Sequence, residues 1–196
     1  MTGAPHAGPN FWQTARVRLR AFTTEDAEVS FLWSLDSQRA RDLEHVWPPA
    51  SREQVEHWVA RKARQSFENG DFDMVIENAA GTPVGAISTH RCDPRTGTFS
   101  YALDIAREHR RRGYAHDAVG LLLRFYFQEC RYQKVTVSVH ADNVASVALH
   151  EKLGFVLEGR LRRMVYTGGR FQDEVWFGQT AEEFAARHPP SQAGPG

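Results

Sequence analysis

Cysteine is scarce in this sequence, because only Cys92 and Cys130 occur among 196 residues. Two thiols cannot form a disulfide framework or a four-cysteine zinc site, so we expect reduced, inert thiols in a cytoplasmic protein. The nine histidines show no spacing typical of metal ligands. We therefore predict no structural or catalytic metal.

Long apolar runs and an excess of one charge are also missing. No run of about 18 apolar residues occurs, which argues against a membrane span. The 24 basic and 24 acidic residues balance, and the basic run at 107–112 is only local. The chain thus has no overall field that would attract a polyanion, and we expect neither nucleic acid nor a membrane as a partner.

The composition divides the chain into one folded unit and two short ends. Residues 1–12 and 189–196 are rich in proline, glycine and small side chains, and we expect flexible termini there. The intervening residues 13–188 are enough for one domain with a sizeable core.

Hydrophobic periodicity and turn residues predict an α+β fold for this domain. Strands are expected at 16–22, 73–77, 83–89, 98–105, 134–140, 155–167 and 171–180. Helices are expected at 23–35, 39–43, 51–69, 115–131 and 145–153. Tight turns join several successive strands into an antiparallel meander, and the helices cover the faces of a mixed sheet.

The most informative stretch runs from Ile105 to Ala115 and contains Arg110 and Gly113. It predicts a strand that enters a basic loop, and the far end of this loop begins an amphipathic helix. Gly113 allows a backbone conformation that a side chain would forbid, while free amides and the helix dipole favour a phosphate there. We infer a diphosphate site; the alternative is an exposed, arginine-rich turn that only precedes a helix.

Two further motifs follow along the chain. N-x-x-S covers Asn143 to Ser146, and L-H-E-K-L-G-F covers Leu149 to Phe155. With I-x-x-x-x-R-x-x-G-x-A at 105–115, their order resembles the GNAT superfamily of acetyl-CoA-dependent N-acetyltransferases. The opening V-R-L-R-A-F-T-T-E-D and the closing E-G-R-L-R-R-M-V-Y-T-G-G-R-F-Q-D-E-V-W-F-G-Q-T are similar to the branch that acetylates ribosomal-protein N-termini.

The resemblance implies both a fold and an activity. The fold is a single GNAT-like α+β domain with a mixed, mostly antiparallel sheet of about seven strands, splayed at its centre and flanked by helices. The activity is transfer of an acetyl group from acetyl-CoA to a primary amine, on a peptide N-terminus or a small molecule, by direct attack. A homodimer is expected, because the last strands often pair between subunits in this superfamily.

The resemblance also implies which residues hold the cofactor. Main-chain groups at the strand end would bind the pantetheine arm, and amides of the following turn would bind the pyrophosphate. The strand-end residues are Asp104, Ile105, Ala106 and Arg107, and the turn residues are Arg110, Arg111, Arg112, Gly113, Tyr114 and Ala115. The Asn143 side chain would bond the pantetheine, although asparagine at a helix start is also a common N-cap. For each arginine side chain, plain solvent exposure is the alternative.

The candidate catalytic residues for proton transfer are Ser146, His150 and Tyr101. Many members carry a tyrosine before E-K-x-G-F that is proposed to protonate the thiolate, and His150 takes that place here. Ser146, near the cofactor sulfur in the branch resembled, is the rival donor, and His150 is alternatively a packed histidine. The candidates for the base that receives the amine proton are His90, Tyr101, Asp104, His140, Glu158 or a water chain.

The acceptor cleft is expected beside helices in the first third of the chain, as in the superfamily. Its candidates are Trp33, Trp47 and Trp58, with Glu44 and His45 nearby. Aromatic rings with a carboxylate would suit a cationic amine, and ordinary packing of the tryptophans is the alternative. Because His150 replaces the expected tyrosine, a non-catalytic CoA-binding sensor or scaffold is the alternative function.

Overall fold

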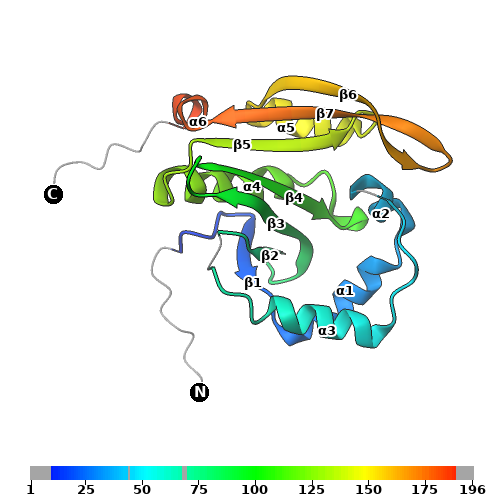
Figure 1. Ribbon diagram of the computed structural model, residues 1–196. Coiled ribbons are helices and arrows are strands. Elements are labelled where there is room, and N and C mark those ends of the chain that lie inside the picture. The colour runs from blue at the N-terminus through cyan, green and yellow to red at the C-terminus, as the bar shows by residue number, and fades with distance from the viewer. Residues whose placement is uncertain (1–9, 44, 68–69, 189–196) are drawn as a thin grey trace, which may run out of the picture.

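A seven-stranded sheet runs through the molecule in the order β1-β2-β3-β4-β5-β7-β6 (Figure 1). The structure is a computed structural model and describes residues 10–43, 45–67 and 70–188. The strands are β1 (Val17–Ala21), β2 (Asp73–Asn78), β3 (Pro83–Asp93), β4 (Thr98–Ile105), β5 (Lys134–His140), β6 (Val156–Thr167) and β7 (Arg170–Thr180).

The helices lie around this sheet. They are α1 (Ala27–Ser34), α2 (Ser37–Leu43), α3 (Arg52–Lys62), α4 (Tyr114–Arg124), α5 (Val144–Leu153) and α6 (Ala181–Arg187). Short 3-10 turns form η1 (Thr24–Asp26) and η2 (Arg107–His109), and a π-helical turn forms η3 (Phe125–Glu129). Within the described ranges, no helix has both the length and the apolar character needed to cross a bilayer.

The centre of the sheet opens between β4 and β5. These strands are parallel and pair only at Thr98 with Lys134 and at Phe99 with Val135, whereas all other neighbours in the described sheet are antiparallel. Beyond these pairs, β5 no longer bonds β4. On its other edge, β5 pairs with β7 along its whole length. The predicted α+β domain with a mostly antiparallel, centrally splayed sheet is therefore confirmed.

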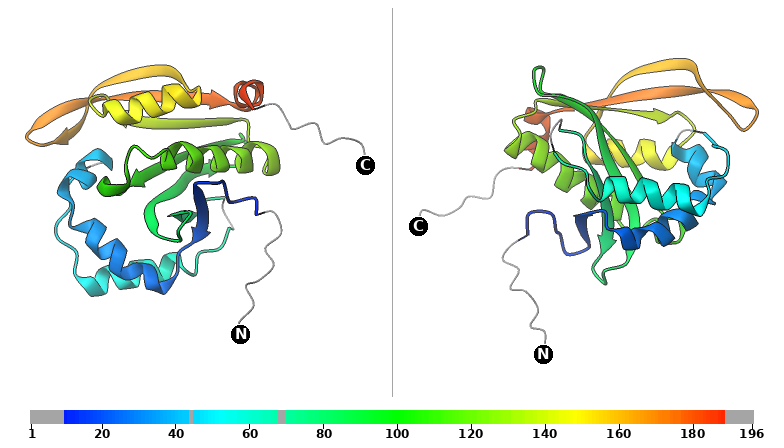
Figure 2. Two further views of the ribbon diagram at one scale, coloured as in Figure 1. Left: turned by 180° about the vertical axis from the view of Figure 1, so that it is seen from behind. Right: turned by 60° about the horizontal axis from the view of Figure 1, so that its bottom comes forward.

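Helices cover both faces of the sheet, and α4 and α5 lie together on one face (Figure 2). On that side α4 buries Val119 and Leu122 against Leu19 and Ile76. On the other face α1 and α3 close a second cluster, formed by Phe22, Val55, Val59 and Val75. Because consecutive residues of a strand point to opposite faces, β2 contributes to both clusters and is buried on both sides.

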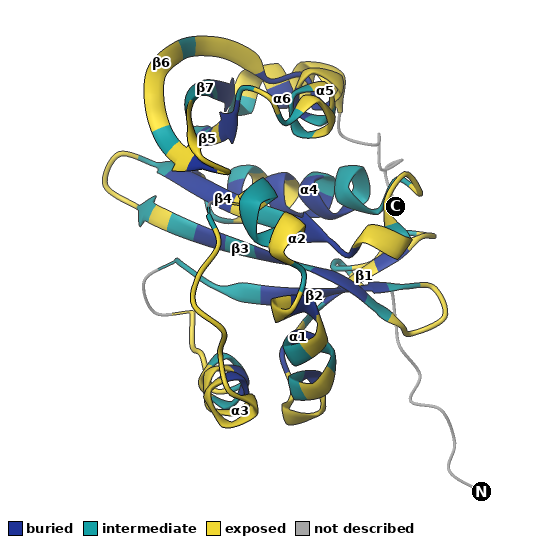
Figure 3. Ribbon diagram, turned by 90° about the vertical axis from the view of Figure 1, so that its right-hand side faces the viewer, coloured by how far each residue is buried: buried dark blue, intermediate teal, exposed yellow. Residues whose placement is uncertain are grey.

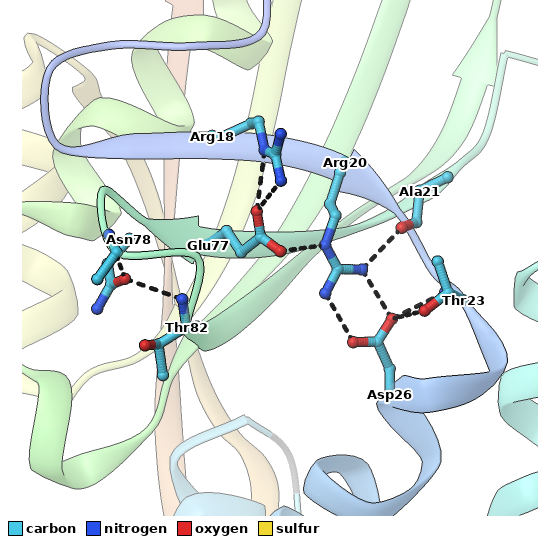
Figure 4. Close-up of polar contacts among 9 residues, drawn as sticks. Arg18, Arg20, Ala21, Thr23, Asp26, Glu77, Asn78 and Thr82 are labelled. Carbon is cyan, nitrogen blue, oxygen red and sulfur yellow. Dashed lines mark hydrogen bonds and ion pairs between the residues drawn. The ribbon is translucent and has the colours of Figure 1, made fainter. Parts of the chain in front are cut away.

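An ion-pair network holds the start of α1 against the sheet (Figure 4). The Arg20 guanidinium donates two 2.8 Å hydrogen bonds to Asp26 and lies 2.5 Å from a carboxylate oxygen of Glu77. Glu77 also pairs with Arg18, and both carboxylates are buried. Burial alone would raise the pKa of the Asp26 and Glu77 carboxyls, but the bonds from arginine lower both pKa values.

The sequence patterns did not predict the helix α6, although its first residues form a recognisable capping motif. Thr180 caps it, because its hydroxyl accepts from the Glu183 amide at 3.3 Å, while the Glu183 carboxylate accepts from the Thr180 amide at 2.9 Å. Phe184, on this helix, is only 2% exposed. This T-x-x-E capping box follows β7 without any loop, so strand periodicity up to Thr180 concealed the helix.

Other boundaries differ from the predicted ones at helix ends. The helix expected at 23–35 begins as η1, the one at 51–69 ends at Lys62, and the one at 115–131 continues from α4 into the π-helical turn. At the N-terminal end, Trp12 packs against the main core and contacts Phe72, so packing begins before residue 13. Residues 1–9 and 189–196 of the predicted termini lie outside the described residues.

Candidate active site

The opening between β4 and β5 widens toward the carboxyl ends of both strands. Just past the last strand pair, the hydroxyls of Ser100 and Thr136 lie 3.2 Å apart. Farther along, β4 bonds only β3 within the described sheet, and Ile105 stands opposite Gly85. A side chain at Gly85 would come within 2.1 Å of the Asp104 carbonyl, so this glycine lets β3 approach the carboxyl end of β4 closely.

The turn after β4 presents helix amides at this open end. Arg111 and Gly113 both have left-handed backbones, with φ of 64° and 82°, and Gly113 is the N-cap of α4. Among the residues that the structure describes, no side chain caps the amides of this helix start. Free amides at the N-terminus of an α-helix, together with its dipole, favour an anion. The predicted turn from Arg110 to Ala115 thus has the backbone geometry of an anion site.

A further cation lies over this turn and was not found in the sequence. The Arg16 guanidinium bonds Asp117 of α4 at 2.9 Å, and a Cβ at Gly113 would lie 2.9 Å from Arg16 Nη1. Arg16 precedes β1 and is 101 residues from its carboxylate partner. No local pattern in the sequence signals such a contact.

The arginines of the turn have unlike surroundings. Arg110 donates to the Ile105 carbonyl at 3.0 Å and to Asp42 of α2 at 2.9 Å. Arg107 lies 3.7 Å from Asp36, and Arg112 donates to the Glu108 carbonyl at 3.3 Å. Arg111 is exposed. The helix α2 is thereby tied to the turn that follows β4.

Asp104 anchors the same helix from the end of β4. Its buried carboxylate bonds Arg39 of α2 and lies 3.9 Å from Arg110. Burial raises the pKa of the Asp104 carboxyl, and the Arg39 guanidinium opposes this rise. Asp104 therefore has a structural partner at the strand end. Its neighbour Ala106 is buried, and the Ala106 amide bonds the Val84 carbonyl at 2.9 Å.

The start of α5 stands at the end of β5 and carries Asn143 and Ser146. The Asn143 carbonyl oxygen Oδ1 accepts from the Ser146 amide at 3.1 Å, so Asn143 is the N-cap of α5. Its Nδ2 atom donates to the Asp42 carbonyl at 3.4 Å. Consequently α2 bridges the ends of β4 and β5, which Figure 3 shows from that side of the molecule.

His150 and Tyr101 form a buried pair behind Ser146. His150 Nδ1 lies 2.7 Å from the Ser146 carbonyl, which can only accept, so Nδ1 carries the proton and donates it. Nε2 is then the acceptor for the Tyr101 hydroxyl at 2.9 Å. Burial raises the pKa of Tyr101 well above its ordinary value and lowers that of His150, against a smaller raising effect of the Ser146 carbonyl.

The Ser146 hydroxyl is the more accessible member of this group. Ser146 is half-buried, and its Oγ lies 3.5 Å from His150 Nδ1, at the limit of a hydrogen bond. Both faces of His150 are packed, with Phe177 stacked at 5.8 Å and Phe155 edge-on at 5.1 Å between ring centroids. The imidazole is therefore fixed in place under the first turn of α5.

A cavity of about 500 Å³ opens beside Asn143. It lies between α2, the start of α5 and the turn that joins β6 to β7, and its walls include Gln38, Arg41, Asp42, His140, Asn143 and Arg170. Among the five candidate bases, His140 alone lines it. His90 is half-buried on β3, where burial lowers its pKa, and Glu158 pairs with Lys134 at 2.5 Å.

The tryptophans expected at the acceptor cleft do not line this cavity. Trp33 is 9% exposed with the Arg39 guanidinium over its ring, and Trp58 packs edge-on against Phe22. Trp47 is 65% exposed and contacts the His45 ring. Glu44, the expected carboxylate, lies outside the described residues.

The remaining polar groups give no sign of thiol or metal chemistry. Burial raises the pKa of Cys92 to about 12 and also raises the pKa of Cys130, so both thiols stay protonated. Across the described ranges, no three His, Cys, Asp or Glu side chains are grouped so that they could hold a metal ion.

Comparison with known proteins agrees with this architecture. Residues 16–156 match the Acetyltransferase (GNAT) domain family. The SPbeta prophage-derived uncharacterized N-acetyltransferase YokL of Bacillus subtilis is 35% identical over 91% of this chain and 97% of its own length. The spermidine N(1)-acetyltransferase of Vibrio cholerae is 24% identical over 81% of this chain and 90% of its own.

Solved structures share the fold. The crystal structure of the Vibrio cholerae spermidine N-acetyltransferase in complex with CoA and spermine superposes with a TM-score of 0.76 at 21% identity, covering 87% of this chain and 99% of that one. A probable acetyltransferase reaches 0.77 at 22% identity, covering 87% of this chain and 96% of that one. With a family match across most of its length, this chain belongs to the GNAT acetyltransferase family and is an acetyl-CoA-dependent N-acetyltransferase.

Proposed function

We propose that acetyl-CoA binds in the opening between β4 and β5 and that the acetyl group passes to a primary amine in the cavity beside Asn143. The two-pair junction of the parallel strands carries this proposal, because it leaves one edge of β4 without a strand partner in the described sheet. Asp104, Ile105, Ala106 and Arg107 form the end of that edge, where the pantetheine arm extends along β4. The main-chain groups left for it exclude the Ala106 amide, which bonds β3, and the Ile105 carbonyl, which accepts from Arg110.

The pyrophosphate is assigned to the start of α4. Of the amides from Arg110 to Ala115, that of Arg110 already donates to the Arg107 carbonyl at 3.3 Å, so the amides after it are the hydrogen-bond donors for the phosphate. Gly113 keeps the backbone open to the ligand. Arg16 places a guanidinium over the same glycine, with its charge shared with Asp117. The Arg110 side chain stays paired with Asp42, so the backbone amides of the turn make the phosphate contacts.

The reaction is direct attack of an uncharged amine on the thioester carbonyl. A C–N bond forms, the C–S bond breaks, and the thiolate is protonated through the Ser146 hydroxyl, which takes a replacement proton from water and so acts as a relay. Ser146 is half-buried, whereas His150 and Tyr101 are buried. The buried Tyr101–His150 pair acts as a positioning group, because it fixes the first turn of α5 through the Ser146 carbonyl. His140 or a water beside it receives the amine proton.

The nature of the relatives supports catalysis over a CoA sensor, and one of them is named for an amine substrate, spermidine. A putative ribosomal N-acetyltransferase, YdaF of Bacillus subtilis, is also similar, at 28% identity over 53% of this chain. Both a small-molecule amine and a peptide N-terminus therefore belong to the acceptor classes to be tested, in a cytoplasmic enzyme.

Homodimer formation through β6 is part of the proposal. This strand lies at the edge of the sheet and exposes Leu157, Leu161, Met164 and Tyr166, each at least 42% exposed. Large exposed apolar side chains on one edge strand are typical of an interface. Light scattering on wild type and Leu161→Glu tests this, with a dimer expected for the first and a monomer for the second.

Thiol release from acetyl-CoA in the presence of an amine panel tests the activity. Wild type is expected to release CoA with at least one amine, and Ser146→Ala to lower kcat about 100-fold with little change in the Kd for CoA. Ser138→Ala, on the exposed side of β5, is the matched control and keeps wild-type kinetics. Thermal stabilisation by CoA with no turnover for any amine would instead establish the sensor function.

A further inference from the structure

The charges of the cavity beside Asn143 point to the chemistry of the acceptor. Two acidic side chains in its wall are already neutralised. Asp142 pairs with Arg170 at 2.8 Å. Asp42 pairs at 2.9 Å with Arg110, which does not itself line the cavity. These pairs leave no carboxylate of the wall without a cation.

Arg41 is the charge that remains. It lines the cavity from α2, is half-buried, and has no carboxylate partner among the residues that the structure describes. It follows Ala40 and precedes Asp42, whose carbonyl lies 3.4 Å from Asn143 Nδ2. The Arg41 guanidinium is thus part of the cavity wall, and the next residue along the chain, Asp42, contacts the start of α5.

We propose that the acceptor is a small amine that also carries a carboxylate, and that Arg41 binds this carboxylate while the amine faces the thioester. The inference rests on the proposed function and adds the class of substrate to it. A planar guanidinium matches a carboxylate with two parallel hydrogen bonds, which supplies orientation as well as affinity. Both groups of the acceptor lie in one cavity of about 500 Å³, which has room for an amino acid.

The same charges disfavour a polyamine. A second ammonium group in this cavity would meet Arg41 and two carboxylates that are already paired. Like charges in a confined site repel, and no free carboxylate of the described wall offsets the loss of hydration. The substrate class inferred for this chain therefore differs from the one for which the spermidine acetyltransferase is named.

The test compares matched acceptors that differ only in the carboxylate. Free amino acids, the corresponding amino acid amides and spermidine are each supplied with acetyl-CoA, and kcat/KM is measured from thiol release. The amine of an amino acid amide is the less basic of the two, so more of it is uncharged near neutral pH. A preference for the free acid therefore cannot arise from amine ionisation.

Wild type is expected to favour at least one free amino acid over its amide and over spermidine by about tenfold or more. Arg41→Gln is expected to abolish this preference mainly through KM, and Arg41→Lys to retain part of it. Arg64→Gln is the matched control, because Arg64 is exposed after α3 and does not line the cavity. Thermal unfolding of all variants establishes that they are folded.

The outcomes separate the two proposals. Equal or better acetylation of amides or spermidine by wild type overturns the carboxylate inference and leaves the transferase intact. A preference that survives in Arg41→Gln also overturns it. No thiol release with any amine overturns the proposed function, and the inference with it.

Discussion

The Tyr101 hydroxyl donates a 2.9 Å hydrogen bond to Nε2 of His150, and this bond links β4 to α5. The opposite ring nitrogen donates to the Ser146 carbonyl. Both nitrogens of the imidazole are therefore used within the protein, and the neutral form is the one that satisfies both partners. The pair holds Ser146 at the open end of the sheet.

Removing the tyrosine hydroxyl should destabilise the fold. Tyr101→Phe leaves the buried Nε2 of His150 without a donor, and the free energy of unfolding is expected to fall by about 1–2 kcal/mol in urea titrations. Ser138→Ala, which removes an exposed hydroxyl from β5, is the matched control and should change it by less than about 0.5 kcal/mol. Equal stability of the two variants would show that the buried bond contributes nothing.

The buried histidine also predicts the direction of a pH effect. Burial lowers the pKa of His150 in the folded state below its ordinary value of 6.5, so the unfolded chain binds more protons in acid. The stability of the folded state is then complete above about pH 6.5 and declines as the pH falls from there toward the folded-state pKa.

His150→Phe should flatten this decline. Because burial lowers the pKa of His90 in the same direction, the informative quantity is the difference between wild type and variant across the pH series. Urea titrations at successive pH values measure it. Parallel curves for the two proteins would contradict the assignment of a neutral His150.

The glycine at the start of α4 should be required for CoA binding. Gly113→Ala places a Cβ at 2.9 Å from Arg16 Nη1 on a backbone with φ of 82°, and CoA affinity is expected to fall about tenfold, as measured by calorimetry. Gly81→Ala has a φ of 78° with nothing within 4 Å of the added carbon. Gly81→Ala therefore reproduces the backbone strain without the contact. An equal loss of CoA affinity in the two variants would contradict the prediction.

Freeing Arg110 should strengthen cofactor binding. Asp42→Asn removes the carboxylate that now pairs with Arg110, so that the guanidinium is available to the pyrophosphate, and the Kd for CoA is expected to fall about threefold to tenfold. Glu129→Gln, an exposed residue beyond α4, makes the same change in net charge away from the site. Tighter binding in both variants would indicate only a general charge effect, which added salt would screen.

The ion-pair network at the start of α1 should be sensitive to loss of its shared cation. Arg20→Met leaves the buried carboxylates of Asp26 and Glu77 with less compensation, and the free energy of unfolding should fall by about 3 kcal/mol at neutral pH. Since arginine lowers both carboxyl pKa values, wild type loses this stability as the pH falls below about 4, and the difference between the proteins narrows there. A constant difference at all pH values would argue against the network.

Local patterns predicted the parts of the site that depend on neighbouring residues. Gly113 as a residue with a special backbone conformation and Asn143 as a possible N-cap both follow from short-range backbone rules, and the structure has both. The sheet followed from alternating hydrophobicity, while its splayed centre came from the resemblance to a family.

Contacts between distant segments were beyond such patterns. Arg110 and Asp42 are 68 residues apart, and Arg16 and Asp117 are 101 apart. Periodicity tells which face of an element is buried, but it does not tell which residue of another element lies opposite. For the same reason Tyr101 and His150 were each singled out without being paired. That Arg41 has no carboxylate partner among the described residues was likewise visible only once its neighbours were placed.

Phe99, at the last pair between the parallel strands, stacks on Tyr126 with ring centroids 4.0 Å apart, and both side chains are at most 1% exposed. A close-packed, buried contact between two rings therefore lies at the point where the two halves of the sheet begin to separate. Because close-packed interiors transmit small changes in volume, the aperture is set by core packing rather than by surface loops. A substitution that shortens the side chain of Phe99 or Tyr126 would therefore change the width of the opening, and with it the position of the thioester, without contacting the thioester.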